Sequence, residues 1–155
     1  MIRVFTDMTA DLFHYGHVEF LKRARALGDY VLVGLHNDEV LEAHKRKPVL
    51  TMEERITSVA GCRWVDEVIP NAPWKFDPAW IEKYSIDLVV HGDDYSQERL
   101  EYFYEVPLEL GIFRTIPYHL GISTSDIIRR CKEANVTQIG HDEIEIAKGS
   151  GDESN

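Results

Sequence analysis

The stretch "IRVFTDMTADLFHYGHVEFLKRARALGDYVLVGLH", residues 2–36, decides the fold class. Residues 2–8 are a short β-rich run, and residues 18–28 place apolar side chains at helical spacing, with Gly28 where the helix should stop. Residues 30–36 form a near-continuous apolar run rich in β-branched side chains, as expected of a parallel strand covered on both faces. The stretch therefore predicts a strand–helix–strand unit.

The same alternation continues to residue 134. We expect further helices over 51–62, 77–85, 96–111 and 123–134, and further strands over 65–70, 86–92 and 112–119. Thr51 and Ser123 are predicted N-caps, and Pro107 is expected to interrupt its helix. Alternating strands and helices predict a Rossmann-like, doubly wound parallel α/β sheet, which binds ligands at the carboxyl ends of its strands.

Length and composition indicate one globular domain. The chain has 155 residues, of which 44% are hydrophobic and 28% charged, and these values exclude a disordered or fibrous class. We assign the domain to residues 1–135. Residues 136–155 are acidic, with Gly and Ser near the end, and we expect a flexible tail there.

Charge and cysteine content narrow the partners and the compartment. The net charge of −10 argues against a nucleic-acid partner, although a small anionic ligand needs only a local cluster of donors. Cys62 and Cys131 match no zinc or disulfide pattern. No signal peptide opens the chain and no apolar run reaches the length of a membrane span, so we expect a soluble cytoplasmic protein.

Two histidines, His14 and His17, follow the first strand, where this fold presents its ligand site. At a helix N-terminus they could bind or protonate a phosphate, and Gly16 between them would let the backbone approach it. A structural role is the second interpretation. Metal ligation is the third, and it requires other histidines to converge on the pair, namely His36, His44, His91 and His119.

Near the other end of the chain, "GISTSDII" places Gly121, Ser123, Thr124 and Ser125 at a predicted helix start. One hydroxyl would suffice to cap this helix. Three successive hydroxyls also fit a second phosphate-binding segment with backbone and side-chain donors. The segment alone does not decide between these two roles.

Five motifs occur in order along the chain: "DLFHYGH", "HK" before an "ER" helix, "VDEVIPNAPW", "HGDDY" and "GISTSDII". Through them residues 2–132 resemble the cytidylyltransferases that act on glycerol 3-phosphate, phosphocholine and phosphoethanolamine. The HxGH motif within the first belongs to a wider nucleotidyltransferase superfamily, whereas "GISTS" and "VDEVIPNAPW" are narrower marks of the cytidylyl branch.

The resemblance implies that the phosphate of a small alcohol attacks the α-phosphorus of CTP and displaces pyrophosphate. His14, His17 and Lys45 would be the catalytic residues. Nucleotide contacts are implied at Thr6, Asp7, Met8, Gly16, Arg55, His91, Gly92, Asp94, Gly121, Ser123, Thr124 and Ser125. Acceptor contacts are implied at Trp74, Asp93, Tyr118 and His119.

The resemblance also implies Mg²⁺ bound with CTP, held by phosphate oxygens and water rather than by protein side chains. It further implies a homodimer that pairs through "RWVDEVI", residues 63–69. For several of these residues the sequence also allows a purely structural role. Lys45 could be a solvated loop cation, Arg55 a helix-surface charge and Trp74 a packed loop residue, and Asp93 and Asp94 could form a turn at the end of a strand.

Two departures from the family pattern flank the predicted phosphate site. The arginine that usually precedes Gly-Ile-Ser-Thr is absent, since "YHL" stands before Gly121, and Arg114 lies too far upstream to replace it. In the first loop, "MTA" stands where relatives commonly have Gly, a β-branched residue and Phe. We therefore hypothesise an unusual acceptor, such as a phosphonate, with CTP retained.

Three rival functions stay open at this level. An adenylyltransferase would use ATP, because the histidines and the last helix say nothing about the base. A non-catalytic nucleotide-binding domain would bind without turnover. A metal-binding protein would use the histidines as ligands.

Overall fold

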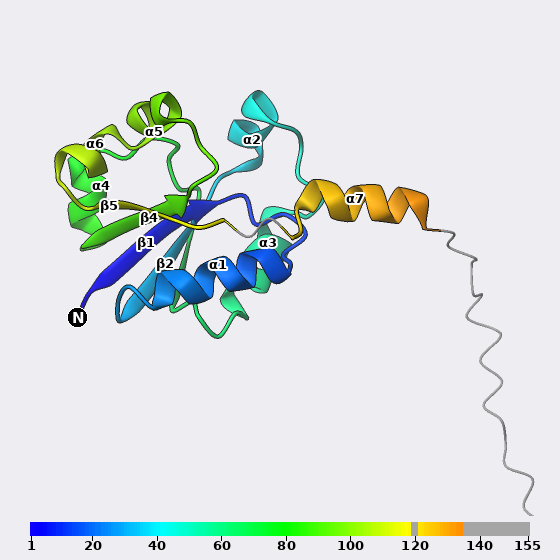
Figure 1. The fold of residues 1–155 in the computed structure, drawn as a ribbon, viewed down its shortest axis with the longest axis horizontal. Coiled ribbons are helices and arrows are strands. Elements are labelled where there is room, and N and C mark those ends of the chain that lie inside the picture. Colours follow the sequence, from blue (N-terminus) through cyan, green and yellow to red (C-terminus); the bar gives the residue numbers. More distant parts are fainter. Residues whose placement is uncertain (119–120, 135–155) are drawn as a thin grey trace, which may run out of the picture.

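The protein is described here from a computed structural model that covers residues 1–118 and 121–134. Its centre is one parallel sheet of five strands in the order β3-β2-β1-β4-β5 (Figure 1). The strands are β1 (Arg3–Met8), β2 (Tyr30–Leu35), β3 (Glu67–Pro70), β4 (Leu88–Gly92) and β5 (Phe113–Ile116). This order confirms the predicted doubly wound α/β fold.

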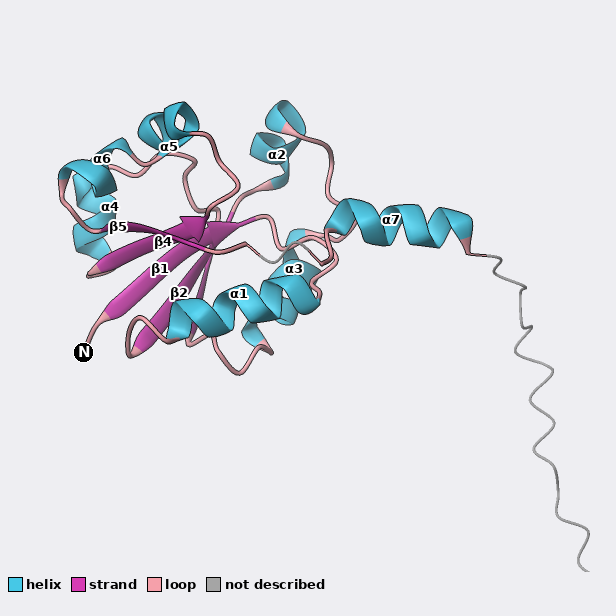
Figure 2. Ribbon diagram, viewed as in Figure 1, coloured by secondary structure: helices cyan, strands magenta, loops and turns pink. Residues whose placement is uncertain are grey.

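Helices cover both faces of the sheet. They are α1 (Tyr15–Arg25), α2 (Asp38–His44), α3 (Met52–Ala60), α4 (Pro78–Lys83), α5 (Gln97–Phe103), α6 (Glu105–Glu109) and α7 (Thr124–Glu133). Helices α1 and α3 lie on one side, and α4, α5 and α6 on the other (Figure 2). Helix α7 projects from the body near the carboxyl ends of the strands (Figure 1).

The core follows the period-two alternation of the central strands. Phe5 and Leu32 face α4 and α5, where they pack with Phe76 and Ile81. Val31 faces the opposite side with α1 and α3. Because both faces of β2 are covered, its side chains are almost all apolar, which explains the near-continuous hydrophobic run at residues 30–36.

Helix α2 was not predicted. Asn37 caps it, since the Asn37 side-chain oxygen accepts a hydrogen bond of 2.8 Å from the N–H of Val40. Asp38 and Glu39 occupy its first turn, where carboxylates favour the helix dipole. The sequence "NDEVLEAH" thus carries a helix-start signal, but the single buried side chain, Leu41, leaves almost no apolar periodicity to detect.

The predicted break at Pro107 is wrong. The segment divides at Tyr104, between α5 and α6, and Pro107 lies inside the first turn of α6. Proline is tolerated there because an N–H in the first helical turn has no partner within the helix. The break lets the Tyr104 side chain turn inward, where it is 2% exposed.

Gly28 does not cap α1, which ends earlier, at Arg25 with Ala26 as its C-cap. A Cβ at Gly28 would lie 2.5 Å from Cγ2 of Val4 and 2.8 Å from the carbonyl oxygen of Ile2. The glycine is therefore required by the close approach of the α1–β2 connection to β1, not by helix termination.

Other predictions concern the ends of the chain and its thiols. The proposed tail, 136–155, lies outside the described residues. Cys62 is buried, Cys131 is exposed, and neither is in a disulfide. Among the helices of residues 1–118 and 121–134, none is long and apolar enough to cross a membrane.

The burial of Leu32 gives a test of this core. Leu32 is fully buried in β2, so Leu32→Ala should lower the free energy of unfolding by about 2–5 kcal/mol through lost contacts and a residual cavity. Leu110→Ala is the matched control, since Leu110 is 52% exposed, and should change it by less than about 0.5 kcal/mol. Urea unfolding measures both, and equal losses would contradict the assigned core.

Candidate active site

A cleft of about 460 Å³ opens at the carboxyl ends of the strands. Its walls come from β1 and the β1–α1 loop, the segment between α2 and α3, the ends of β4 and β5, and the start of α7. Twelve of the predicted site residues line it: Asp7, Met8, Gly16, His17, Lys45, Trp74, His91, Gly92, Asp94, Tyr118, Thr124 and Ser125.

The two histidines cap α1 reciprocally. His14 is the N-cap residue, and its Nδ1 accepts a hydrogen bond of 3.0 Å from the N–H of Gly16. Nδ1 of His17 accepts one of 3.1 Å from the N–H of His14. The ring centroids lie 4.0 Å apart. Imidazoles thus take the place of the Ser/Thr and Glu side chains that usually form this capping pair.

This capping fixes the tautomer of both rings. A nitrogen that accepts from a backbone N–H carries no proton, so in the neutral ring the proton is on Nε2. Nε2 of His14 is buried without a hydrogen-bond partner among the described residues. His17 lines the cleft and can therefore offer its Nε2–H to a ligand, whereas the Nε2–H of His14 is buried against its neighbour, with the two ring centroids 4.0 Å apart. An Nε2–H donor on the cleft wall favours phosphate handling over the purely structural interpretation.

Burial keeps both imidazoles neutral. Burial, reinforced by the neighbouring His14, lowers the pKa of His17 to about 3, and the carboxylate of Asp11 only partly opposes this. Burial also lowers the pKa of His14. Near neutral pH the pair therefore acts through hydrogen-bond donors rather than through positive charge.

Gly16 is required by the ring of His14. A Cβ at Gly16 would lie 2.9 Å from Cε1 of His14 and 3.3 Å from Cγ2 of Ile122. The sequence predicted Gly16 as a point of close approach for a phosphate. In the structure the glycine lets the His14 imidazole fold over the start of α1 while α7 passes beside it.

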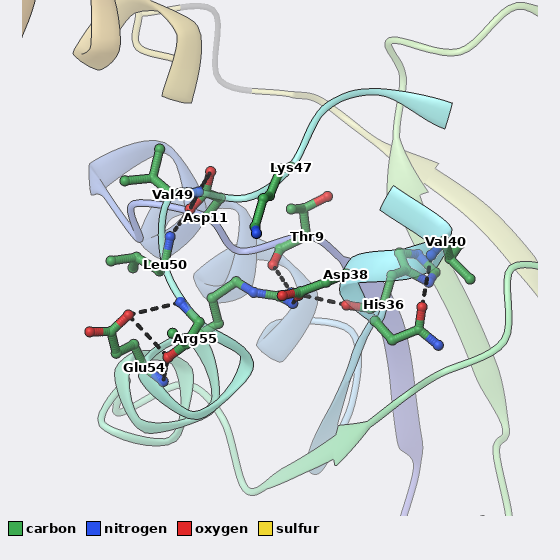
Figure 3. A network of polar contacts seen from close by, with 12 residues as sticks. Thr9, Asp11, His36, Asp38, Val40, Lys47, Val49, Leu50, Glu54 and Arg55 are labelled. Atoms are coloured by element: carbon green, nitrogen blue, oxygen red, sulfur yellow. Dashed lines mark hydrogen bonds and ion pairs between the residues drawn. The ribbon is translucent and has the colours of Figure 1, made fainter. Parts of the chain in front are cut away.

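Asp11, which sequence reasoning missed, holds three segments of the site together, and Figure 3 shows its contacts with Val49 and Leu50. Its carboxylate accepts hydrogen bonds of 3.0 Å and 2.9 Å from the N–H groups of Val49 and Leu50, and Arg46 pairs with it at 2.9 Å. Its carbonyl oxygen accepts a hydrogen bond of 2.9 Å from the hydroxyl of Thr124. Backbone donation from Leu50 and Val49 and the charge of Arg46 outweigh burial and lower the pKa of Asp11.

Arg55 is fully buried, so the helix-surface alternative is wrong. Its guanidinium donates to the carbonyl oxygens of Thr9 (2.8 Å) and His36 (3.0 Å) and to the carboxylate of Asp38 (2.6 Å), as Figure 3 shows. Arg55 does not line the cleft. Its hydrogen bonds join the ends of β1 and β2 to α2. Because Arg55 has no exposed surface in this structure, it offers no contact to a nucleotide here.

The three hydroxyl residues at the start of α7, Ser123, Thr124 and Ser125, have different contacts. Ser123 is the N-cap and exchanges hydrogen bonds with Asp126, as the capping interpretation predicted. Thr124 bonds to Asp11, whereas Ser125 is exposed on the cleft wall. The Ser125 hydroxyl and those first-turn N–H groups that the Ser123 cap does not use therefore remain as donors at this end of the cleft.

Lys45 follows α2 and lines the cleft, although the residue as a whole is exposed. Loss of water around its ammonium group lowers the pKa of Lys45, and the carboxylate of Asp94 opposes this shift. Within residues 1–118 and 121–134 it forms no ion pair. Lys45 is therefore a cation on the cleft wall.

At the sheet end of the cleft, Asp7 is buried in a polar network. It accepts from the hydroxyl of Tyr104 at 2.8 Å and contacts Nε2 of His36 at 3.0 Å, while Nδ1 of His36 bonds the carbonyl oxygen of Ala72 at 3.2 Å. Burial alone would raise the pKa of Asp7, but His36 and Tyr104 lower it overall. Both oxygens of Asp7 are thus already occupied.

Aromatic rings surround this end. Trp74 stacks on His44 with centroids 4.9 Å apart and lies 4.4 Å from the ring of His36. The ring of Tyr95 lies 4.3 Å from that of His91. These rings leave the half-exposed carboxylate of Asp94 facing the cleft, 3.9 Å from Nδ1 of His91.

Tyr118 lies where the family pattern has its arginine. Its ring lines the cleft and packs over Gly92, where an added Cβ would lie 3.1 Å from Cδ2 of Tyr118. Burial, helped by Asp94, raises the pKa of Tyr118, so its hydroxyl stays neutral. Asp93 does not line the cleft, and its carboxylate accepts a hydrogen bond of 2.8 Å from the N–H of Tyr118.

The remaining predicted residues lie beside the cleft or outside the described part. Thr6 is fully buried in β1. His14 and Gly121 adjoin the cleft without being part of its wall. His119 lies outside the described residues.

The donor set does not form a metal cage. In the part of the chain that the structure describes, no group of three or more His, Cys, Asp or Glu side chains could hold a metal ion. His14 and His17 use Nδ1 for capping, and Asp7 and Asp11 are already bonded.

The fold and the cleft together define a Rossmann-like α/β domain whose ligand site lies at the carboxyl ends of its parallel strands. The chain belongs to the Cytidylyltransferase-like family, whose pattern it matches over residues 5–130. The sequence-based recognition of this family is confirmed.

Named relatives extend this result. The chain is 46% identical over 134 residues to ethanolamine-phosphate cytidylyltransferase of Arabidopsis thaliana, with 82% of this chain and 32% of the relative covered. It is 40% identical over 132 residues to human choline-phosphate cytidylyltransferase A, with 83% and 36% covered. The chain therefore spans about a third of the length of these relatives.

Among solved structures, the lipopolysaccharide core biosynthesis protein of Thermoplasma volcanium shares the fold. The match has a TM-score of 0.65 at 23% identity and covers 77% of this chain and 98% of that one. At this identity the likeness supports the fold alone.

The low pKa of His17 can be measured directly. Between pH 8 and pH 5 its ring should stay neutral with the proton on Nε2, as read from ¹⁵N chemical shifts, because the folded pKa is about 3. In denaturant, the control state, the same ring should titrate near pH 6.5. Since the unfolded chain takes up the proton first, this histidine's contribution to stability should fall as the pH drops from about 6.5 toward 3. A folded-state pKa near 6.5 would contradict the buried capping geometry.

Proposed function

We propose that this protein is a CTP-dependent cytidylyltransferase that transfers CMP to the phosphate of a small amino alcohol. The observation that carries the proposal is the reciprocal cap of His14 and His17, which fixes two neutral Nε2–H donors beside the cleft and the start of α7. The names of the relatives supply the base and the acceptor class.

The triphosphate of CTP would lie between α1 and α7. There His14 and His17 would donate from Nε2, and the first-turn N–H groups of α7, with Ser125, would bind the β- and γ-phosphates. Lys45 would neutralise charge on the reacting phosphates. These groups are held in place before the ligand arrives, so they can stabilise developing charge with little reorganisation.

The reaction would be a direct displacement. An oxygen of the acceptor phosphate forms a bond to the α-phosphorus of CTP, the bond from that phosphorus to the bridging oxygen breaks, and pyrophosphate leaves with both electrons. No proton has to move for this exchange, which suits histidines that stay neutral. The work of the protein is therefore alignment and charge stabilisation.

Mg²⁺ would accompany CTP and screen the charge of the triphosphate. The protein contributes little to holding it, because the carboxylates of Asp7 and Asp11 are already bonded. Lys45 and the histidines would then orient the phosphate chain around the ion.

The acceptor head group would occupy the sheet end of the cleft. Asp94 offers a half-exposed carboxylate there, and Trp74 and Tyr95 offer aromatic rings. A carboxylate beside aromatic faces fits a cationic amino group. The phosphate of such an acceptor could reach Lys45, whose pKa responds to Asp94.

A product screen tests the proposal. The chain should convert CTP, with phosphoethanolamine or phosphocholine, into a CDP-alcohol and one equivalent of pyrophosphate, detected by mass spectrometry. Replacing CTP by ATP tests for an adenylyltransferase. Replacing the acceptor by glycerol 3-phosphate or by phosphonates tests for the unusual acceptor suggested by the missing arginine. Binding of CTP without any pyrophosphate release would favour the non-catalytic alternative.

Matched variants test the residue roles. His17→Ala and Lys45→Ala should each lower kcat/KM by about a hundredfold or more, since each removes a donor to the reacting phosphates. Lys22→Ala removes an equal charge from the exposed side of α1 and should leave kcat/KM unchanged. The roles fail if all three variants retain activity.

The homodimer is proposed at the edge of the sheet. Strand β3 is an edge strand, and it ends the segment 63–69 to which the family resemblance assigns the interface. Sedimentation equilibrium should give twice the chain mass of 17.9 kDa. A charge substitution there, Val68→Glu, should shift the species toward the monomer, and a wild-type monomer at all concentrations would contradict the interface.

A further inference from the structure

The cleft contains a second cation that neither the motifs nor the site prediction identified. Arg46 follows Lys45 and lines the cleft together with Asp11, Thr124 and Ser125. Its side chain is 41% exposed, whereas its partner Asp11 is 2% exposed. The guanidinium thus extends from a buried anchor into solvent within the cleft.

Arg46 is not needed to satisfy Asp11. The carboxylate of Asp11 already accepts from the N–H groups of Val49 and Leu50, and these contacts involve both of its oxygens. On the arginine, only Nη1 is used, by Asp11 and by the carbonyl oxygen of Lys47. Nη2 and Nε have no hydrogen-bond partner within residues 1–118 and 121–134, so donors remain for a ligand.

The position of Arg46 is set by the same residue that positions α7. Asp11 binds Arg46 through its carboxylate and Thr124 through its carbonyl oxygen. The guanidinium and the start of α7 are therefore both bound to one residue, three positions before the N-cap His14. A polyanion bound at the start of α7 would lie within the field of this cation.

The charges in and around the cleft favour a role for Arg46 in binding a polyanion. The imidazoles of His14 and His17 are neutral, and Lys45 stands next to Asp94. A triphosphate carries several negative charges, and the chain as a whole has a net charge of −10. A second fixed cation at the phosphate end would offset this repulsion.

We propose that Arg46 binds the phosphate chain of the nucleotide, supplying in this chain a cation at the end of the cleft where the arginine before Gly121 is absent. The inference rests on the proposed function, because it assumes that a nucleoside triphosphate occupies the cleft. Asp11 acts as its positioning residue, since it aligns the guanidinium without touching the ligand.

The test is a comparison of CTP with cytidine by isothermal titration calorimetry, with magnesium present throughout. Arg46→Gln should weaken CTP binding by about tenfold or more, because it removes a charge-assisted contact, and should leave cytidine binding unchanged. Arg46→Lys keeps a cation but loses the fork of donors, so its loss should be smaller. Arg114→Gln is the matched control, since Arg114 is exposed on β5 and does not line this cleft.

The outcomes are separable. If the wild-type chain binds no CTP, the proposed function fails and this inference fails with it. If the wild type binds CTP and Arg46→Gln binds it equally well, or weakens CTP and cytidine alike, only the role of Arg46 is overturned. Thermal unfolding checks that Arg46→Gln is folded. If Arg46→Gln is unfolded, CTP binding is compared between the wild type and Arg46→Lys, because the lysine can keep the ion pair with Asp11. Equal CTP binding by Arg46→Lys and wild type would then overturn the inference.

Discussion

The buried carboxylate of Asp11 is the constraint on which the site depends. The carboxylate ties the β1–α1 loop to the segment before α3, and the backbone carbonyl oxygen of Asp11 ties the same loop to α7. The residues on either side, Ala10 and Leu12, adopt left-handed φ angles of 55° and 48°. Such angles are unfavourable for residues with a side chain, so the bonds made by Asp11 must offset the strain.

In the proposed complex, two kinds of group would recognise the phosphates. His14 and His17 use their Nδ1 atoms to cap α1, which leaves neutral Nε2–H donors of fixed direction. Positive charge comes instead from Lys45 and Arg46, on the segment between α2 and α3. Directional donors on one side and fixed charge on the other would allow a strongly acidic chain to bind the proposed polyanion.

Much of the architecture was predictable because it follows local signals. Apolar runs gave the five strands, and Thr51 and Ser123 cap their helices as expected. The exceptions have physical reasons that lie outside local patterns. Gly28 serves a close contact with β1, and the helix break falls at Tyr104, whose hydroxyl bonds to Asp7, 97 residues away in sequence.

The site was predictable where a motif marked it and not where tertiary contacts made it. His17 and Thr124, each marked by a motif, line the same cleft. Asp11 gave no distinct signal, because its partners are backbone groups of a segment almost forty residues away. The burial of Arg55 could have been predicted from the sequence. Arg55 lies one helical turn before the buried Val59 and therefore shares its face of α3.

We propose that neutral imidazoles on α1 and the start of α7 hold the triphosphate of CTP between them. A crystal structure of the complex with CTP and magnesium would test this. We expect phosphate oxygens within hydrogen-bond distance of Nε2 of His14 and His17, with the β- and γ-phosphates at the N-terminus of α7. A triphosphate bound away from both histidines, or imidazoles rotated so that Nδ1 no longer caps α1, would contradict it.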